Sequence, residues 1–191
     1  RAGGVAATTV WTWGRRRRGV LGAGEESDAA DVPAAAPLAL TALGGVRIAQ
    51  VCCGELHSLA LGIEGTVYSW GSGLMGALGH GGRRDEQQPR QVGQLPRVRQ
   101  LAAGKHHSAA LCEADAEVYW FGWDGCDTSA CQRSPLALAH LRGAGTRQIA
   151  AGAFHLAALT ASDGVATCGG GVVLAGVLSG VGVVQIAGGT R

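Results

Sequence analysis

The sequence has few charged side chains, and their two signs nearly cancel. Lys and Arg together number 16 and Asp and Glu number 14, so the formal net charge is only +2. Charged residues make up 16% of the chain, against about 25% in an ordinary soluble domain. So small a charge gives no indication of a nucleic-acid or membrane partner. Hydrophobic residues nevertheless make up 47% of the chain, which excludes a wholly disordered protein.

Motifs for metal, nucleotide or nucleophile chemistry are also lacking. None of the six cysteines forms a C-x-x-C pair, and no cysteine–histidine spacing is that of a zinc finger. Residues 19–24 read G-V-L-G-A-G but lack the Lys-Ser/Thr ending of a phosphate loop. Ser58 and Ser108 follow histidines without a nucleophile elbow. We therefore expect no enzyme active site, no metal and no cofactor in this chain.

The first residues lack the basic region and the unbroken apolar stretch of a secretory signal. Reduced thiols are then expected, which predicts a cytoplasmic or nuclear protein. One alternative comes from the C-terminal part, where no charged residue lies between Asp163 and Arg191. Gly176 and Gly180 there have the spacing of a helix-packing pair, so a transmembrane helix stays open. The many glycines of this stretch favour the reading without a membrane.

Glycine is abundant: 33 of the 191 residues are glycine, about 17%, where about 7% is usual. No G-X-Y period is present, which excludes collagen, so the glycines indicate many tight turns between short strands. A phrase G-x-x-H occurs three times, with its histidines 50 and 48 residues apart, in 54–61, 104–111 and 152–159. A short apolar phrase that ends in glycine follows each copy, at 67–71, 118–122 and 165–169, and an earlier copy stands at 10–14.

The short apolar runs within each repeat have the composition of β-strands buried on both faces. Glu64-Gly65 and Asp163-Gly164 lie between such runs and predict tight hairpin turns. Asp115-Ala116 breaks this pattern and predicts a longer or distorted turn. A period of about 50 residues fits propeller blades of four antiparallel strands.

The run A-x-G-x-x-H-S-x-A-L, then V-Y-S-W-G, then G-x-L-G-H-G resembles the regulator of chromosome condensation repeat family. Residues 48–97 carry the best copy. The family's seven-bladed propellers imply an all-β fold, here a partial, fragmentary β-propeller of about three and a half repeats. We expect one propeller domain in four parts: 1–47, the end of a truncated repeat plus a long loop that includes the Ala/Pro-rich 29–42; 48–97; 98–147; and a degenerate, truncated 148–191. Seven blades need roughly 350 residues, so we expect a fragment, with two copies that complete each other as the alternative.

The resemblance implies a protein–protein interaction module within a larger regulatory protein. Its alternatives are a guanine nucleotide exchange factor for a small GTPase and the substrate-recognition arm of a ubiquitin ligase. Protein partners are therefore expected, with a small GTPase as a candidate, and neither nucleic acid nor membrane. A plant UV-B photoreceptor of the family has a G-W-R-H-T phrase, which here reads G-E-L-H-S, G-K-H-H-S and G-A-F-H-L, without tryptophan.

The histidines of the repeats recur at one place in each blade, so we expect them to lie a blade apart and to bond backbone rather than a metal. His106 and His140 break the period and are expected to be exposed. Arg15–Arg18 is read as loop decoration, with a nuclear-localisation or phosphate-binding patch as the alternative. The residues predicted to form the structural repeat motif are Gly54, His57, Trp70, Gly71, Gly79, Gly104, His107, Gly122, Gly152, His155 and Gly169.

Overall fold

The computed structural model describes residues 8–15, 17–24, 33–123, 131–162, 164–169, 172–175 and 183–189. Their strands form one two-stranded and three four-stranded antiparallel sheets. The bounds are β1 Trp11–Arg15, β2 Pro33–Ala39, β3 Ile48–Cys53, β4 His57–Gly62, β5 Val67–Gly71, β6 Glu86–Gln91, β7 Val98–Ala103, β8 His107–Cys112, β9 Val118–Gly122, β10 Gln132–Ala137, β11 Gln148–Ala151, β12 Leu156–Leu159, β13 Val165–Gly169 and β14 Val172–Ala175, with 3₁₀ turns η1 Thr41–Leu43 and η3 Ala139–Leu141.

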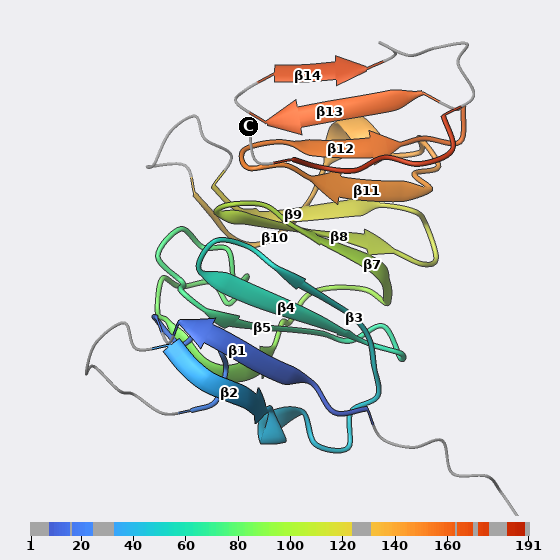
Figure 1. Cartoon of the computed structure of the whole chain (residues 1–191). Coiled ribbons are helices and arrows are strands. Elements are labelled where there is room, and N and C mark those ends of the chain that lie inside the picture. The colour runs from blue at the N-terminus through green and yellow to red at the C-terminus, as the bar shows by residue number, and fades with distance from the viewer. Residues whose placement is uncertain are drawn as a thin grey trace, which may run out of the picture.

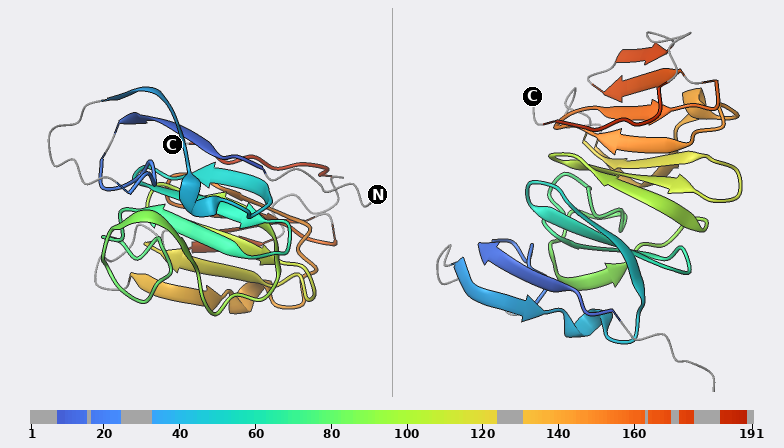
Figure 2. Two further views of the ribbon diagram at one scale, coloured as in Figure 1. Left: turned by 90° about the horizontal axis from the view of Figure 1, so that it is seen from below. Right: turned by 45° about the vertical axis from the view of Figure 1, so that its right-hand side comes forward.

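The sheets follow one another along the chain, as Figures 1 and 2 show. Each four-stranded sheet is a meander whose strands lie in chain order, β3-β4-β5-β6, β7-β8-β9-β10 and β11-β12-β13-β14. Neighbouring sheets meet through their first two strands, because β7 contacts β3 and β4 on one side and β11 on the other. This arrangement is that of propeller blades, and it confirms the predicted all-β, partial propeller.

The second strand of a blade is the most enclosed. All six residues of β4 and all six of β8 are buried. After the histidine, small residues predominate in both strands, which read S-L-A-L-G in β4 and S-A-A-L-C in β8, so each strand fits between two sheets. The fourth strands lie at the outer edge, where β6 carries Pro89 and β10 carries Pro135. Proline cannot donate a ladder hydrogen bond, so it protects such an edge from pairing with another chain.

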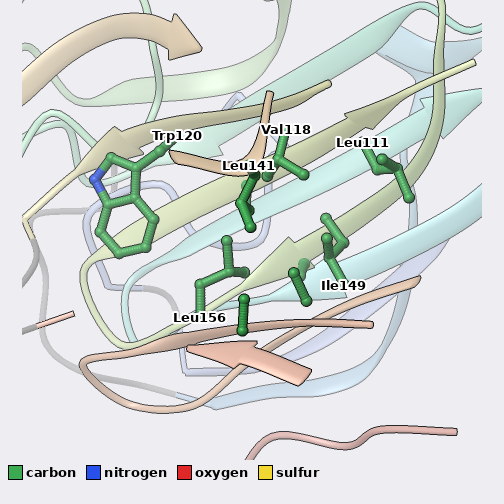
Figure 3. Close-up of a cluster of buried hydrophobic side chains, with 10 residues drawn as sticks. Leu111, Val118, Trp120, Leu141, Ile149 and Leu156 are labelled. Carbon is green, nitrogen blue, oxygen red and sulfur yellow. The ribbon is translucent and has the colours of Figure 1, made fainter. Parts of the chain in front are cut away.

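The apolar core lies between blades rather than within one. One cluster joins Leu111, Val118 and Trp120 of the second complete blade to Ile149 and Leu156 of the third, with Leu141 of η3 beside them (Figure 3). The other two clusters repeat this arrangement between the preceding sheets. Each blade therefore depends on its neighbour for burial.

The hairpin turns follow the sequence closely. Gly65 has φ +80°, as expected for the turn between β4 and β5. The turn between β8 and β9 is one residue longer, because the Cys112 N–H bonds the Glu117 carbonyl whereas the Gly62 N–H bonds that of Thr66. Ala116 there adopts φ +55°, which confirms the predicted distortion. Asp163 lies outside the described residues.

One expectation for the rest of the chain was wrong. Within the segment predicted as a surface loop, residues 33–39 form β2, which pairs with β1. Alanine and proline do not indicate a strand, but β2 is the fourth strand of its blade, and a strand at the outer edge needs little β-propensity. In the uncharged C-terminal stretch, β13 and β14 form a hairpin. Within the described residues, no helix is long and apolar enough to span a bilayer.

Candidate functional site: the repeat motif and the loop face of the blades

At the first glycine of each G-x-x-H phrase, the histidine ring occupies the space that a side chain would need. A Cβ added at Gly104 would overlap the imidazole of His107 and would lie 2.6 Å from the carbonyl oxygen of Gly152 in the next blade. Gly54 makes the same approach to His57, as does Gly152 to the ring of its own histidine, His155. Only glycine allows the ring and the neighbouring backbone to come so close.

The glycine at the end of the third strand packs against the start of the second strand. A Cβ added at Gly122 would lie 2.6 Å from the Cα of His107, and one at Gly169 would lie 2.6 Å from that of His155. Gly71 meets the backbone at residues 56 and 57 in the same way. All three have φ between +100° and +141°, which side chains rarely tolerate.

The G-x-L-G phrase of one blade packs on the aromatic residue of the next. A Cβ added at Gly79 would lie 2.9 Å from the ring of Phe121, just as one at Gly22 would lie 2.8 Å from the indole of Trp70. The Trp70 indole N–H also donates to the carbonyl of Val20, 2.9 Å away. This aromatic position therefore joins two blades.

His57 bonds a side chain of the next blade. Its Nε2 lies 3.0 Å from the hydroxyl of Ser108, and that hydroxyl donates to the carbonyl of Ala77 at 2.8 Å. Because the serine proton is used on Ala77, His57 donates from Nε2. Both side chains are buried, so this hydroxyl links two blades in the interior.

His107 is fully buried and stacks on Trp120, with ring centroids 4.1 Å apart. Neither of its ring nitrogens has a hydrogen-bond partner of good geometry among the described residues. Burial, and then the neighbouring His57 and His155, lower its pKa to about 3, although the His155 backbone acts in the opposite direction. Burial likewise lowers the pKa of His57 to about 4. Both rings are neutral near pH 7.

Sequence reasoning missed a second link between blades, made by glutamine. The amide of Gln50 donates to the carbonyl of Leu101 at 2.9 Å and accepts from its N–H at 2.8 Å. Gln100 repeats this bidentate contact on Ile149, and Gln148 repeats it on Ile186. The signal was present, since a glutamine precedes each repeat's first glycine by four residues.

The residues between glycine and histidine gather on one face of the blades, which we call the loop face. His106 packs against Trp123 at 5.8 Å and Phe154 at 6.5 Å between ring centroids. The Lys105 ammonium lies 5.5 Å from the Phe154 centroid and 3.4 Å from a carboxylate oxygen of Glu55. The expectation that His106 is exposed was wrong, because its side chain is only 21% exposed among these rings.

Backbone hydrogen bonds hold these loops in register. The N–H of Glu55 donates to the carbonyl of Lys105, and the N–H of Lys105 donates to that of Ala153, at 3.2 and 3.0 Å. Beside them lies an open hollow of about 520 Å³, lined largely by the repeated glycines and their neighbours.

Among the described residues, no group of three His, Cys, Asp or Glu side chains is placed to hold a metal ion. Of the arginine run, Arg18 forms an ion pair with Asp85 at 3.2 Å, so this basic side chain is engaged within the fold.

Comparison with known proteins gives consistent matches. The model of the regulator of chromosome condensation (RCC1) repeat matches residues 9–61 and 64–111. The ultraviolet-B receptor UVR8 of Arabidopsis thaliana is 40% identical over 116 residues, which cover 60% of this chain and 25% of that protein. The human E3 ubiquitin-protein ligase HERC2 is 37% identical over 163 residues, 81% of this chain and 3% of that protein.

Two solved structures share the fold. Human WBSCR16 is 26% identical with a TM-score of 0.70, over 80% of this chain and 40% of that one. Prp20p of Saccharomyces cerevisiae, described with its binding to Gsp1p and histones, is 24% identical with a TM-score of 0.81, over 97% of this chain and 50% of that one. The chain therefore spans half or less of the length of each of these relatives.

Proposed function

Because this chain belongs to the RCC1 repeat family, we propose that it is a protein-binding propeller segment whose loop face contacts the partner. The observation that carries this proposal is the cluster of Lys105, His106, Trp123 and Phe154, contributed by two neighbouring blades. Aromatic residues that are partly exposed beside a cation are enriched at protein interfaces. Phe154 is 39% exposed, and Leu74 extends the same apolar surface at 45% exposure.

The test compares partner capture by matched variants. Phe154→Ala and Trp123→Ala should each lower the captured amount of the partner about tenfold or more, measured by quantitative cross-linking and mass spectrometry. Ile63→Ala is the control, because Ile63 is also 39% exposed but lies in the turn at the opposite end of β4. Equal capture by all three variants would exclude the loop face.

We further propose that the residues predicted as the repeat motif serve the fold rather than a reaction. Supporting this, the glycines of the motif meet the backbone or rings of their own or the next blade in the same way from repeat to repeat. A location in the cytoplasm or nucleus belongs to the same proposal. It agrees with the free thiols of Cys52, Cys53 and Cys112.

Two finer forms of the proposal name the class of partner. A small GTPase as partner predicts faster release of labelled GDP from that GTPase when the chain is added. A role as a recognition arm predicts a ligase domain on the same polypeptide, as HERC2 implies for its own chain. These two predictions are independent of the capture experiment, because the loop-face variants measure only whether the partner binds, and not the activity that follows binding.

A further inference from the structure

Two outer strands carry a proline at the same place but differ in the residue before it. Pro135 of β10 corresponds to Pro89 of β6, so the proline belongs to the repeat. The preceding residue is Gln88 on β6 and Ser134 on β10. Of all the serines and threonines in the sequence, Ser134 is the only one that a proline follows.

The hydroxyl of Ser134 lies at the edge of its sheet. β10 is the last strand of the sheet and pairs with β9 alone, and their ladder is irregular between Gln132 and Leu136. Ser134 lies within this irregular stretch and is half-buried. The amide of Gln132 donates to the Ser134 carbonyl at 2.7 Å, whereas the Ser134 hydroxyl forms no hydrogen bond with the described residues.

A loop of the preceding blade lies against each outer strand in the same way. The N–H of Gly24 donates to the carbonyl of Gln87 at 3.0 Å. At the next joint, the N–H of Gly81 donates to the carbonyl of Arg133 at 2.9 Å. Gly81 therefore holds the place beside β10 that Gly24 holds beside β6.

Serine leaves a space that glutamine fills at the other joint. A Cβ added at Gly24 would overlap the amide of Gln88. One added at Gly81 would lie 3.6 Å from the hydroxyl of Ser134, which is ordinary contact. Phosphoserine has as many atoms along its side chain as glutamine, with phosphorus in the place of the amide carbon. The space beside Gly81 therefore has the size for a phosphorylated serine.

The charges beside the two positions also differ in sign. In the sequence, two glutamates follow Gly24, at 25–26, whereas two arginines follow Gly81 closely, at 83–84. A third arginine, Arg133, precedes the serine. All three arginines are exposed, and none forms an ion pair with a described residue. Arginine binds phosphate through charge-assisted hydrogen bonds, so only the serine position has surroundings that suit a phosphate group.

We propose that Ser134 is a phosphorylation site for a proline-directed protein kinase. The γ-phosphoryl group of ATP is transferred to the Ser134 oxygen, the hydroxyl proton is released and ADP leaves. The phosphate group then lies beside Gly81 and bonds Arg133 and the arginines at 83–84. Because these groups come from two blades, the phosphate joins the outer edges of both.

The first test treats the folded chain with ATP and a purified cyclin-dependent kinase, which is proline-directed. Mass spectrometry should find one phosphate group, on Ser134. Pro135→Ala keeps the hydroxyl and should lower the rate about tenfold or more. A synthetic peptide of residues 129–140 is the control for the enzyme. Phosphorylation of the peptide but not of the folded chain, or of neither, would overturn the proposal.

The second test asks whether the arginines bind the phosphate. In ³¹P NMR, the second pKa of the phosphoserine should lie about one pH unit below its ordinary value of about 6, because the arginines favour the dianion. The double variant Arg83→Ala/Arg84→Ala should restore the ordinary value. Arg90→Ala is the matched control, because Arg90 is exposed but paired with Glu86. An ordinary pKa in the phosphorylated wild type would overturn the proposed binding of the phosphate.

Discussion

At the scale of single residues, a glycine and a histidine three positions later share one space in every repeat. The ring of His107 lies so close to Gly104 that no side chain fits between them. A Cβ at the same glycine would also meet the carbonyl oxygen of Gly152 in the next blade. A methyl group at this position therefore has to displace either a buried ring or a backbone, and neither moves easily in a packed interior.

Gly104→Ala is therefore expected to lower the free energy of unfolding by about 1–3 kcal/mol, the usual cost of overpacking. Urea unfolding followed by circular dichroism measures this change. Gly93→Ala is the matched control, because nothing lies within 4 Å of its added Cβ and it should change stability by less than about 1 kcal/mol. Equal effects of the two substitutions would contradict the packing argument.

The buried histidines give the fold a dependence on pH. In the folded chain the pKa of His57 is lowered to about 4 and that of His107 to about 3, mainly by burial, from an ordinary 6.5. The neutral rings stabilise the fold fully above pH 6.5, and this contribution is lost as the pH falls toward 4. Urea midpoints should decrease over that range.

His107→Asn should flatten this pH dependence while lowering stability at pH 7. The matched control is His140→Asn, at an exposed position on η3, which should leave the profile unchanged. A wild-type midpoint that stays constant from pH 7 to pH 4 would show that burial of the rings does not govern stability.

At the scale of elements, a glutamine side chain joins the first strand of each blade to backbone that follows later in the chain. Its amide takes the place of a peptide group. A primary amide offers one donor and one acceptor side by side, which matches the N–H and carbonyl of a single residue. The strands β3, β7 and β11 all use this contact. The joint thus supplies hydrogen bonds at places where adjacent sheets do not form a ladder.

Gln100→Ala should destabilise the chain by about 1–3 kcal/mol, because the N–H and carbonyl of Ile149 lose their partner in a buried place. Differential scanning calorimetry measures the loss. Gln91→Ala, at an exposed position on the outer strand β6, is the control and should be nearly neutral. Gln100→Glu keeps the acceptor for the Ile149 N–H but loses the donor to the Ile149 carbonyl. Its stability should lie between those of the wild type and Gln100→Ala only if the unpaired carbonyl costs little.

At the scale of the whole molecule, stability is expected to vary along the row of blades. Each blade buries its surface against its neighbours, so a middle blade has two stabilising contacts and an end blade has one. β8 is paired on both edges and buried along its whole length. β1, at one end of the row in Figure 1, is paired on one edge and largely exposed.

Hydrogen exchange followed by mass spectrometry should therefore show the amides of β8 exchanging roughly a hundredfold more slowly than those of β1. The outer strand β6 should be intermediate, because it has one ladder and a proline. Uniform protection of all three strands would mean that the row unfolds as a single cooperative unit, and it would contradict the blade-by-blade account.

Much of this architecture follows from local sequence. The 50-residue period places β4, β8 and β12, and the glycines mark the turns, because backbone conformation is decided by neighbouring residues. β2 escaped notice because alanine and proline carry little strand signal. Only pairing with β1 makes this segment a strand.

The contacts between blades were harder to predict. The bond from His57 to Ser108 joins residues about 50 positions apart, and no local pattern names its acceptor. The aromatic cluster on the loop face was also missed, because His106 and Trp123 are out of phase with the repeat. Their proximity depends on two loops of one blade that meet, where the Trp123 N–H donates to the His106 carbonyl at 2.9 Å.

The glutamine joint has a consequence for how such proteins change over generations. One half of the joint is a side chain carried by a single repeat, and the other half is backbone, which every repeat possesses whatever its sequence. Duplicating, deleting or exchanging a whole repeat leaves each glutamine joint chemically intact. Lineages can thus vary the loop residues of individual blades, and exchange the blades themselves, without compensating mutations at this joint.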